Sequence, residues 1–277
     1  KGQFGRANTY QLKYHNPWMW DERKSLTVRT WLTDGQIGSV NPLQQGNILF
    51  QNERRRGLDL SVGWPTSYEL RTSHKVTYED VKLLDVDKGY KVQSYTFGLS
   101  YDTRDVWFNP SIGEYHTFSI EKGFKLFGSS LDFTRYDLGI RKFFPTFEKQ
   151  ALAARLECGY VTSPQIDDQD IFRSQWYYVG GSTTVRGYDD MAPFSYGNKQ
   201  IIANLEYRFL FNDMFQGVIF LDSGYASSGT INDLSKFKIG KGVGLRINIP
   251  GLGPLRLDYG IDDLGVGRIH FNLGHTF

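Results

Sequence analysis

Apolar and polar residues alternate along most of this chain. In residues 58–64, LDLSVGW, every second position is apolar. A period of two sends successive side chains to opposite faces of a β-strand. Such runs recur about thirteen times, and most approach the roughly 9–11 residues that a tilted strand needs to cross a bilayer. The clearest lie at 58–64, 95–101, 152–160, 201–209, 243–249, 255–261 and 269–277.

One run changes parity. Leu131 and Phe133 occupy odd positions, whereas Tyr136, Leu138 and Ile140 occupy even ones. A β-bulge inserts one extra residue and moves the following side chains to the other face. The sequence therefore predicts a bulge between Phe133 and Tyr136.

The connections between runs alternate between two kinds. Short ones carry Pro, Asn, Asp or Gly, the residues of tight turns; they lie at 16–17, 65–67, 145–146, 212–213 and 250–253. Longer polar connections lie between them, at 34–52, 84–91, 162–198 and 226–238. Short periplasmic turns and long outer loops are typical of a transmembrane antiparallel β-barrel. A soluble β-sandwich is the alternative, but it gives no reason for this alternation.

Composition supports the same class. Aromatic residues make up 16% of the chain, and many end a strand as membrane-interface residues do: Tyr10, Trp18, Trp20, Trp107, Phe108, Phe209, Phe211 and Phe277. No run approaches the roughly 18 apolar residues of a membrane helix. A net charge of +2 gives no support for nucleic-acid binding. The single cysteine, Cys158, is interpreted as a packing residue, and Arg54–Arg56 as a solvated strand edge.

The chain shows no internal linker, so residues 1–277 are interpreted as one barrel domain. Single-chain bacterial barrels usually close with an even number of strands. With about thirteen visible strands, the first strands are expected to be missing, either cut away or disordered. Residues 1–6 would be what remains of the last missing one.

The longest polar connection contains the sequence GGSTTVRGY at residues 180–188. Further along, residues 220–224 read FLDSG, and the chain ends in FNLGHTF at 271–277. Together with the turn around Asp102 and Arg104, these segments resemble BamA-like outer-membrane assembly factors and their relatives in two-partner secretion. The resemblance spans residues 10–277 and implies a barrel of sixteen strands. It also implies a long loop folded into the barrel, whose site residues are Gly180, Gly181, Val185, Arg186, Gly187 and Tyr188.

Strand parity predicts partners for the loop arginine. If Leu205 and Leu221 face lipid, then Glu206 and Asp222 face the interior. Arg186 would pair with one or both, since a planar guanidinium suits bidentate contacts with carboxylates. The alternative is an exposed loop arginine with no fixed partner.

Catalytic or metal-binding chemistry finds little support. The five histidines share no metal-ligand spacing, and Ser182 lacks the surroundings of a catalytic nucleophile. Asp167, Asp168 and Asp170 form an acidic patch, for which a solvated loop is favoured over weak Ca²⁺ binding. We therefore expect no enzyme activity, no metal and no cofactor.

The resemblance implies a protein of the outer membrane of a Gram-negative-type envelope, with an organelle envelope as the less favoured alternative. Its implied function is to fold and insert β-barrel proteins through a lateral seam between the first and last strands. The seam strand here would contain Phe271, Gly274 and Phe277, with Gly274 as a hinge or as a small residue beside the loop. An unpaired strand edge is a template for an incoming strand.

Implied partners are unfolded outer-membrane proteins, membrane lipid, and accessory lipoproteins or periplasmic chaperones. Periplasmic domains of the POTRA type are expected upstream. The main alternative function is a two-partner secretion pore that exports an unfolded polypeptide, and a passive porin is the third.

Overall fold

The computed structural model describes residues 2–3, 7–19, 22–40, 48–84, 88–125, 128–164, 175–190, 194–249 and 253–273. These residues form two compact units. The first comprises 1–100, 118–136 and 161–175, and the second comprises 101–117, 137–160 and 176–277. Within the described ranges, no helix has the length and hydrophobicity needed to cross a membrane.

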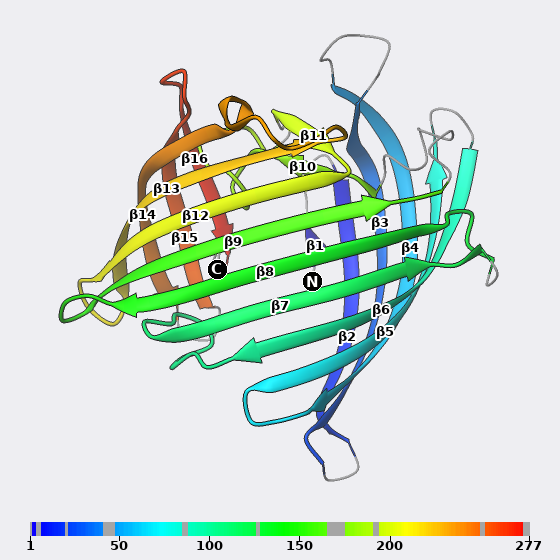
Figure 1. Ribbon diagram of the computed structural model, residues 1–277, viewed down its shortest axis with the longest axis horizontal. Coiled ribbons are helices and arrows are strands. Elements are labelled where there is room, and N and C mark those ends of the chain that lie inside the picture. Colours follow the sequence, from blue (N-terminus) through cyan, green and yellow to red (C-terminus); the bar gives the residue numbers. More distant parts are fainter. Residues whose placement is uncertain are drawn as a thin grey trace. The chain divides into compact units, whose positions relative to one another are not determined.

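The first unit is built on long antiparallel strands. A two-residue strand, β1 (Gly2–Gln3), is followed by the long strands β2 (Ala7–Met19), β3 (Lys24–Val40), β4 (Ile48–Pro65), β5 (Leu70–Leu83) and β6 (Lys88–Asp102). Strands β1 to β5 pair with their sequence neighbours, and Figure 1 shows β2 to β5 side by side. The next strands, β7 (Gly113–Gly123), β8 (Phe133–Pro145) and β9 (Gln150–Thr162), have residues in both units.

The second unit contains the C-terminal strands. These are β12 (Lys199–Leu210), β13 (Phe215–Ser227), β14 (Lys238–Ile249), β15 (Gly253–Ile261) and β16 (Gly267–Leu273), each antiparallel to its neighbour. A short 3₁₀ helix, η3 (Leu234–Lys236), precedes β14. In the described residues the strand order follows the sequence from β1 to β9 and from β12 to β16. Without the stub β1, that gives eight plus five long strands, which confirms the count expected from the alternation.

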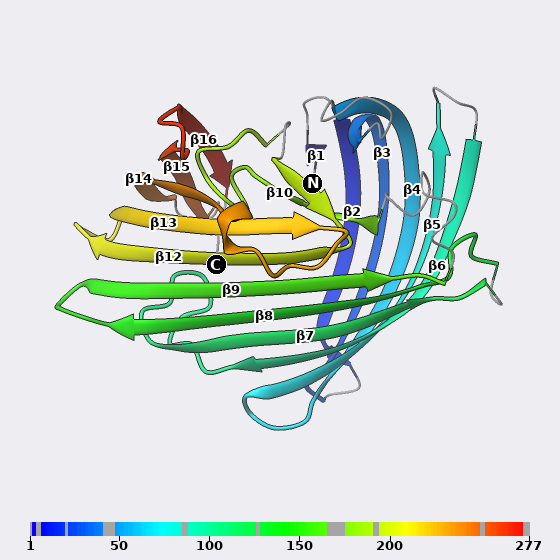
Figure 2. The ribbon, with the colours of Figure 1, turned by 45° about the horizontal axis from the view of Figure 1, so that its top comes forward.

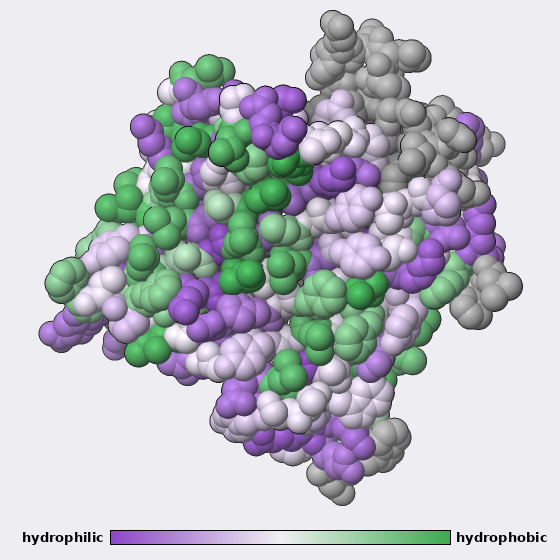
Figure 3. Space-filling view, in the orientation of Figure 1, coloured by the Kyte–Doolittle hydropathy of each residue, from purple (hydrophilic) through white to green (hydrophobic). Residues whose placement is uncertain are grey.

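The two faces of these strands have inverted polarity. On β12 and β13 the exposed side chains include Leu205, Ile219 and Leu221, whereas Glu206 and Asp222 are buried. Figure 3 shows apolar residues gathered on the visible face over β8, β9 and β12. A sheet that exposes its apolar side and buries its charged side suits a lipid environment on the exposed face.

The expected β-bulge in β8 is wrong. Strand β8 runs from Phe133 to Pro145, and Leu131 lies before it. Phe133, Gly139 and Phe143 are buried, whereas Leu138 and Ile140 are exposed on the opposite face. The parity change therefore reflects a strand with apolar residues on both faces, which hydropathy alone cannot distinguish from a bulge.

Two of the expected long loops are largely strand. Strand β3 continues to Val40 and β4 begins at Ile48, so much of the expected 34–52 connection is paired. The connection at 84–91 narrows to residues 84–87. Cross-strand ion pairs border this stretch, including Arg54–Asp34 at 2.6 Å and Arg56–Asp80 at 2.7 Å. A strand that is polar on its exposed face reads as a loop in the sequence.

Gly57 of β4 leaves space for the ring of Trp31, its partner on β3. A Cβ atom at Gly57 would lie 2.1 Å from Trp31 Cζ2. The indole is held in this position because its Nε1 donates to Glu79 Oε1 at 3.2 Å and Arg29 covers its ring at 4.8 Å.

Replacing Gly57 with valine is expected to destabilise the folded protein, since overpacking of this kind costs about 1–3 kcal/mol. The measurement is the unfolding midpoint, monitored by the gel shift between folded and heat-denatured protein. Gly229→Val is the control, because a Cβ there meets nothing nearer than Ser227 Oγ at 3.6 Å. Equal midpoints for the two variants would contradict the packing argument.

Candidate functional site

The connection between β9 and β12 folds back onto the sheet of the second unit. Within it, β10 (Tyr177–Val179) pairs with β11 (Ser195–Gly197) in a small antiparallel sheet. β10 contacts β12 and β13, and β11 contacts β13 most extensively. Figure 2 shows β10 beside β12 and β13. Residues 180–188, here called the arginine loop, lie between β10 and β11.

Glycines set the backbone of the arginine loop. Gly180, Gly181 and Gly187 have φ values of 136°, 104° and 96°, which side chains other than glycine rarely adopt. Gly181 N–H donates to Val185 O at 3.0 Å, and Thr184 N–H donates to Gly181 O at 3.2 Å. The turn closes on itself and presents Arg186 at its end.

Arg186 is buried against two carboxylates. Its Nε and Nη2 donate to the two oxygens of Asp222 at 2.6 and 2.8 Å, and its backbone N–H donates to Asp222 Oδ2 at 3.0 Å. Nη1 donates to Glu206 Oε1 at 2.7 Å. The structure thus places the loop arginine on the two residues that strand parity selected from the sequence. Its guanidinium also stacks over Phe220, with Cζ 3.6 Å from the ring centroid.

The ion pairs continue into a network on the buried face. Glu206 also accepts from Arg208 Nε at 3.0 Å and from Arg246 Nη2 at 3.3 Å. Arg246 Nη1 donates to Asp258 Oδ1 at 2.6 Å. Arg256 Nε lies 3.0 Å from Asp258 Oδ2, and Arg186 Nη1 lies 3.6 Å from the same oxygen. Four arginines and three carboxylates from the loop and four strands therefore form one cluster, which we call the buried charge cluster.

Burial and ion pairing act against each other at Arg186. Burial alone would lower the pKa of its guanidinium, because desolvation disfavours the charged form. Glu206, Asp222 and Asp258 outweigh this effect, and the pKa of Arg186 lies above its usual value. The three carboxylates therefore favour the charged form of the loop arginine.

The sheet makes room for the loop at two glycines that the sequence analysis did not identify. A Cβ atom at Gly240 of β14 would lie 1.8 Å from Arg186 O. One at Gly260 of β15 would lie 2.5 Å from Gly187 N. Both strands alternate residues regularly, so nothing in their pattern indicates that these glycines face the loop. Close backbone approach is a recurrent reason for glycine within a strand.

Side chains from the strands also hold the loop by its carbonyl oxygens. Arg256 Nη2 donates to Ser182 O at 2.6 Å, and Arg155 Nη1 donates to Thr183 O at 3.0 Å. Asn204 Nδ2 donates to Thr184 O at 2.7 Å. Three successive loop carbonyls thus accept bonds from buried polar groups. Polar groups removed from water need hydrogen-bond partners. The loop carbonyls supply partners for the buried side chains of the strands, and these side chains in turn hold the loop in place.

The last described strand, β16, contacts the end of the loop. Gly187 N–H donates to His270 Nε2 at 3.1 Å, and His270 Nδ1 lies 3.1 Å from Asp190 Oδ2. Because Nε2 accepts, the proton of the neutral ring lies on Nδ1 and is donated to Asp190. Arg268 Nη1 donates to Gly187 O at 2.8 Å. His270, which the sequence analysis set aside as scattered, joins the loop to β16.

Tyr188 and the nearby Asp190 make further contacts at this end of the arginine loop. Asp190 also accepts from Ser182 N–H at 2.6 Å and from Ser182 Oγ at 2.7 Å. Partial burial would raise the pKa of Asp190, but the bonds from His270 and Ser182 hold it below its usual value. Tyr188 donates its hydroxyl hydrogen to Asp263 Oδ1 at 2.5 Å, and its ring packs on Phe194.

Of the remaining predicted site residues, Val185 belongs to the arginine loop, and the others belong to the expected seam strand. Val185 is fully buried, and its Cγ2 is 3.1 Å from the Cβ position of Gly224. Phe271 lies in β16 with 64% of its surface exposed, away from the loop. Gly274 and Phe277, expected in the seam strand, lie outside the described residues, as does the acidic patch at 167, 168 and 170. Across the ranges that the structure describes, no group of three acidic, histidine or cysteine side chains could hold a metal ion.

Comparison with curated proteins gives two plant relatives. Outer envelope protein 80, chloroplastic, of Arabidopsis thaliana is 36% identical over 107 residues, which are 35% of this chain and 14% of that protein. Outer envelope protein 39, chloroplastic, of the same plant is 32% identical over 167 residues, which are 56% of this chain and 42% of that protein. The chain thus spans less than half the length of either relative.

Solved structures share the fold. BamA from Haemophilus ducreyi lacking POTRA domains 1–3 has a TM-score of 0.75 at 15% identity, over 96% of this chain and 61% of that one. CdiB from Acinetobacter baumannii has a TM-score of 0.66 at 17% identity, over 97% of this chain and 50% of that one. Identities this low establish a common fold alone.

The sheet with apolar exposed faces and charged buried faces defines the class, which is a transmembrane antiparallel β-barrel protein. The chain belongs to the Omp85 superfamily, whose domain matches it over residues 1–277. This finding agrees with the resemblance drawn from the loop motif.

Replacing Arg186 with alanine is expected to destabilise the loop strongly, since removing one partner of a buried ion pair costs about 3–5 kcal/mol. Arg186→Lys retains the charge but not the two-sided contact with Asp222, so we expect an intermediate effect. Protease cleavage within residues 180–188, quantified by mass spectrometry, reports loop release. If the Arg186→Ala variant resisted protease cleavage in the loop as well as the wild type does, the assignment of Arg186 as the main anchor would be contradicted.

Gly240→Ala tests the close approach of loop and strand. The added methyl group would overlap Arg186 O, so the loop must move even though every charged residue is retained. We expect cleavage in the arginine loop to rise as in Arg186→Ala. Gly229→Ala is the matched control, because its Cβ would meet nothing nearer than Ser227 Oγ at 3.6 Å. Equal loop protection in the two glycine variants would show that the approach at Gly240 is not restrictive.

Proposed function

We propose that this chain is the barrel of a factor that folds and inserts β-barrel proteins into an outer membrane. The observation that carries the proposal is a connection from the arginine loop to β16. Gly187, the neighbour of Arg186 in the chain, forms hydrogen bonds with His270 and Arg268. It joins the buried charge cluster to β16, the strand at the end of the described sheet order. Membership of the Omp85 superfamily and the fold shared with BamA support it.

The proposed mechanism uses main-chain hydrogen bonds at the edge of β16. Among the described strand pairings, β16 pairs with β15 alone. An edge strand offers N–H and C=O groups that an incoming strand can pair with, and each new strand then presents an edge for the next. The loop holds the inner side of β16 through His270 and Arg268, so it keeps the edge strand in position while its exposed face meets lipid.

Secretion is the second candidate function. CdiB shares the fold, and a buried loop could equally control passage of an unfolded polypeptide through the barrel. The two functions differ in where the client polypeptide ends. An assembled client becomes a folded membrane barrel, whereas a secreted client crosses to the other side unfolded.

The proposed partners follow from the assembly function. They are unfolded outer-membrane proteins as clients, membrane lipid, and accessory lipoproteins or periplasmic chaperones that deliver the clients. POTRA-type domains, which the name of the BamA structure mentions for that protein, are proposed upstream of this chain. No catalytic step is required, because strand pairing and lipid burial supply the driving force.

Localisation is proposed to be an outer membrane of the Gram-negative type. The two Arabidopsis relatives are chloroplastic outer envelope proteins by name, and they support the organelle envelope as the alternative. Fractionation of the source cells with antibody against the chain separates the two.

The test of function uses the full-length protein in liposomes. An unfolded barrel client is added outside, and its conversion to the heat-modifiable folded form is followed by gel. We expect faster conversion than in empty liposomes, and a loss of most of the gain in Arg186→Ala. Arg54→Ala is the control, because it removes a half-exposed arginine–aspartate pair of the first unit that makes no part of the buried charge cluster.

Two results would overturn assembly. One is a client that enters the liposome interior unfolded and protease-protected, which supports secretion. The other is a client folding rate unaffected by Arg186→Ala together with high single-channel conductance, which supports a passive porin.

A further inference from the structure

A pocket lies at the short-turn end of the second unit. It is lined by residues of the β6–β7 connection at 103–112, of the β8–β9 connection at 146–149 and of the adjoining strand ends. Figure 1 shows these two connections and the β12–β13 turn at the same end of the strands. The pocket has a volume of about 290 Å³, close to the lower end of the roughly 300–1,000 Å³ that is usual for ligand pockets. It therefore suits a short segment or a small molecule.

The β6–β7 connection forms a fixed wall of this pocket. The Asp105 carboxylate accepts from the backbone N–H groups of Val106 at 2.8 Å and Ser111 at 3.0 Å, and from Ser111 Oγ at 2.5 Å. On the inner side, Arg208 of the buried charge cluster donates from Nη1 to Pro110 O at 3.4 Å. The connection is thus held by its own side chains and by the strand behind it, so the wall is formed before any ligand enters.

Gln216 of β13 brings a buried amide to the pocket. Its exposed fraction is 6%, and it is one of the lining residues. Among the described residues its side-chain amide forms no hydrogen bond, whereas Arg246, its neighbour on β14, donates to Asp258 Oδ1 at 2.6 Å. Buried polar side chains are normally hydrogen-bonded. The Gln216 amide therefore has an acceptor and two donors for a ligand in the pocket.

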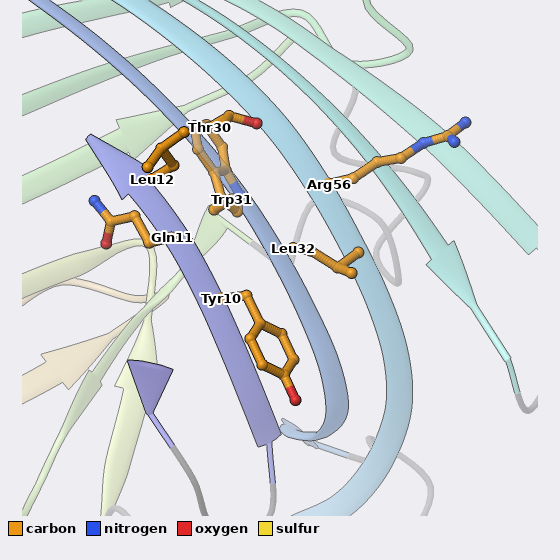
Figure 4. Close-up of a pocket in the computed structure, with 7 residues that line it drawn as sticks. All are labelled: Tyr10, Gln11, Leu12, Thr30, Trp31, Leu32 and Arg56. Carbon is orange, nitrogen blue, oxygen red and sulfur yellow. The ribbon is translucent and has the colours of Figure 1, made fainter. Parts of the chain in front are cut away.

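A larger hollow on the first unit lacks such a group. Figure 4 shows this hollow, whose lining residues come from β2, β3 and β4. Its polar side chains include Gln11, Thr30 and Arg56, and each of them is exposed in part. Water can reach these side chains, so their hydrogen-bonding capacity does not select a ligand. The buried amide distinguishes the pocket of the second unit.

The rest of the pocket lining is mostly apolar. The apolar surface is supplied by Val106, Pro110, Pro145, Phe147 and Leu210. At the exposed rim, Asp105 and Lys149 carry opposite charges. The inner Arg208 is paired with Glu206 at 2.9 Å. Apolar walls and one buried amide, rather than net charge at the rim, therefore determine what the pocket can bind.

We propose that this pocket binds an extended segment of an unfolded polypeptide, with the Gln216 amide paired to a peptide group of its main chain. A peptide group has one N–H donor and one C=O acceptor, which match the carbonyl and NH₂ groups of a glutamine side chain. An unfolded chain exposes such groups, whereas a folded protein has already paired them. Both assembly and secretion handle unfolded polypeptide, so the proposal goes beyond the choice between them.

The test labels the full-length protein in detergent with a photoactivatable peptide. The first probe is a short capped peptide of alternating valine and threonine with a diazirine-bearing leucine at its centre. Cross-links are mapped by mass spectrometry, and we expect them within residues 105–111 and 145–151. A second probe has the same sequence but N-methylated main-chain nitrogens. It should need an about tenfold higher concentration for half-maximal labelling, because it has lost the donors of its main-chain hydrogen bonds.

Gln216→Leu separates a binding role from a structural one. The variant removes the amide and keeps a side chain of similar size, so its unfolding midpoint should equal or exceed that of the wild type. Half-maximal labelling by the first probe should again need an about tenfold higher concentration. Gln200→Leu is the matched control, because Gln200 lies at the opposite end of β12 and does not line the pocket. Its labelling should equal that of the wild type.

Several outcomes would overturn the proposal. Equal labelling of the wild type by the two probes would contradict main-chain recognition, and this comparison needs no variant. Unchanged labelling of Gln216→Leu, or an equal loss in Gln200→Leu, would exclude Gln216 as the binding group. A lowered unfolding midpoint in Gln216→Leu would assign its amide to the stability of the fold. A photoactivatable phospholipid that labels the same residues and excludes the peptide would assign the pocket to lipid.

Discussion

The ion pair between Arg186 and Asp222 is the interaction on which the second unit depends. Asp222 is fully buried, and three of its hydrogen bonds come from Arg186, two from the guanidinium and one from the backbone. An isolated carboxylate in this position would be strongly unfavourable, because burial removes its hydration. The sheet can therefore carry Asp222 only if the loop supplies its partner. The arginine loop and the strands that it contacts therefore fold together.

Shape enforces the same dependence. Gly240 and Gly260 remove side chains where the loop backbone meets β14 and β15, and Gly187 removes one from the loop itself. Packing at this distance leaves no space for a bound water layer between loop and strand. Charge pairing selects the position of the arginine, and the glycines then fix how closely its backbone can approach.

The strands and the arginine site could be predicted because both rest on local rules. Alternation gave the strands, and the parity of Leu205 and Leu221 pointed Glu206 and Asp222 to the buried face. Gly240, Gly260 and His270 could not be predicted, since their roles depend on which strands face a loop distant in sequence. The ion pairs of Arg54 and Arg56 were missed for a related reason. Cross-strand register is a property of the folded sheet, and it turns a polar stretch into a strand.

The composition of the buried charge cluster has an electrostatic consequence. Arg186 is the only one of its four arginines that comes from the loop, and the strands supply Arg208, Arg246 and Arg256 with Glu206, Asp222 and Asp258. Three positive and three negative charges thus belong to the wall itself. A polypeptide that took the place of the loop would meet six cluster charges that sum to zero, and a single basic side chain would be enough to restore the charge that Arg186 adds to the cluster.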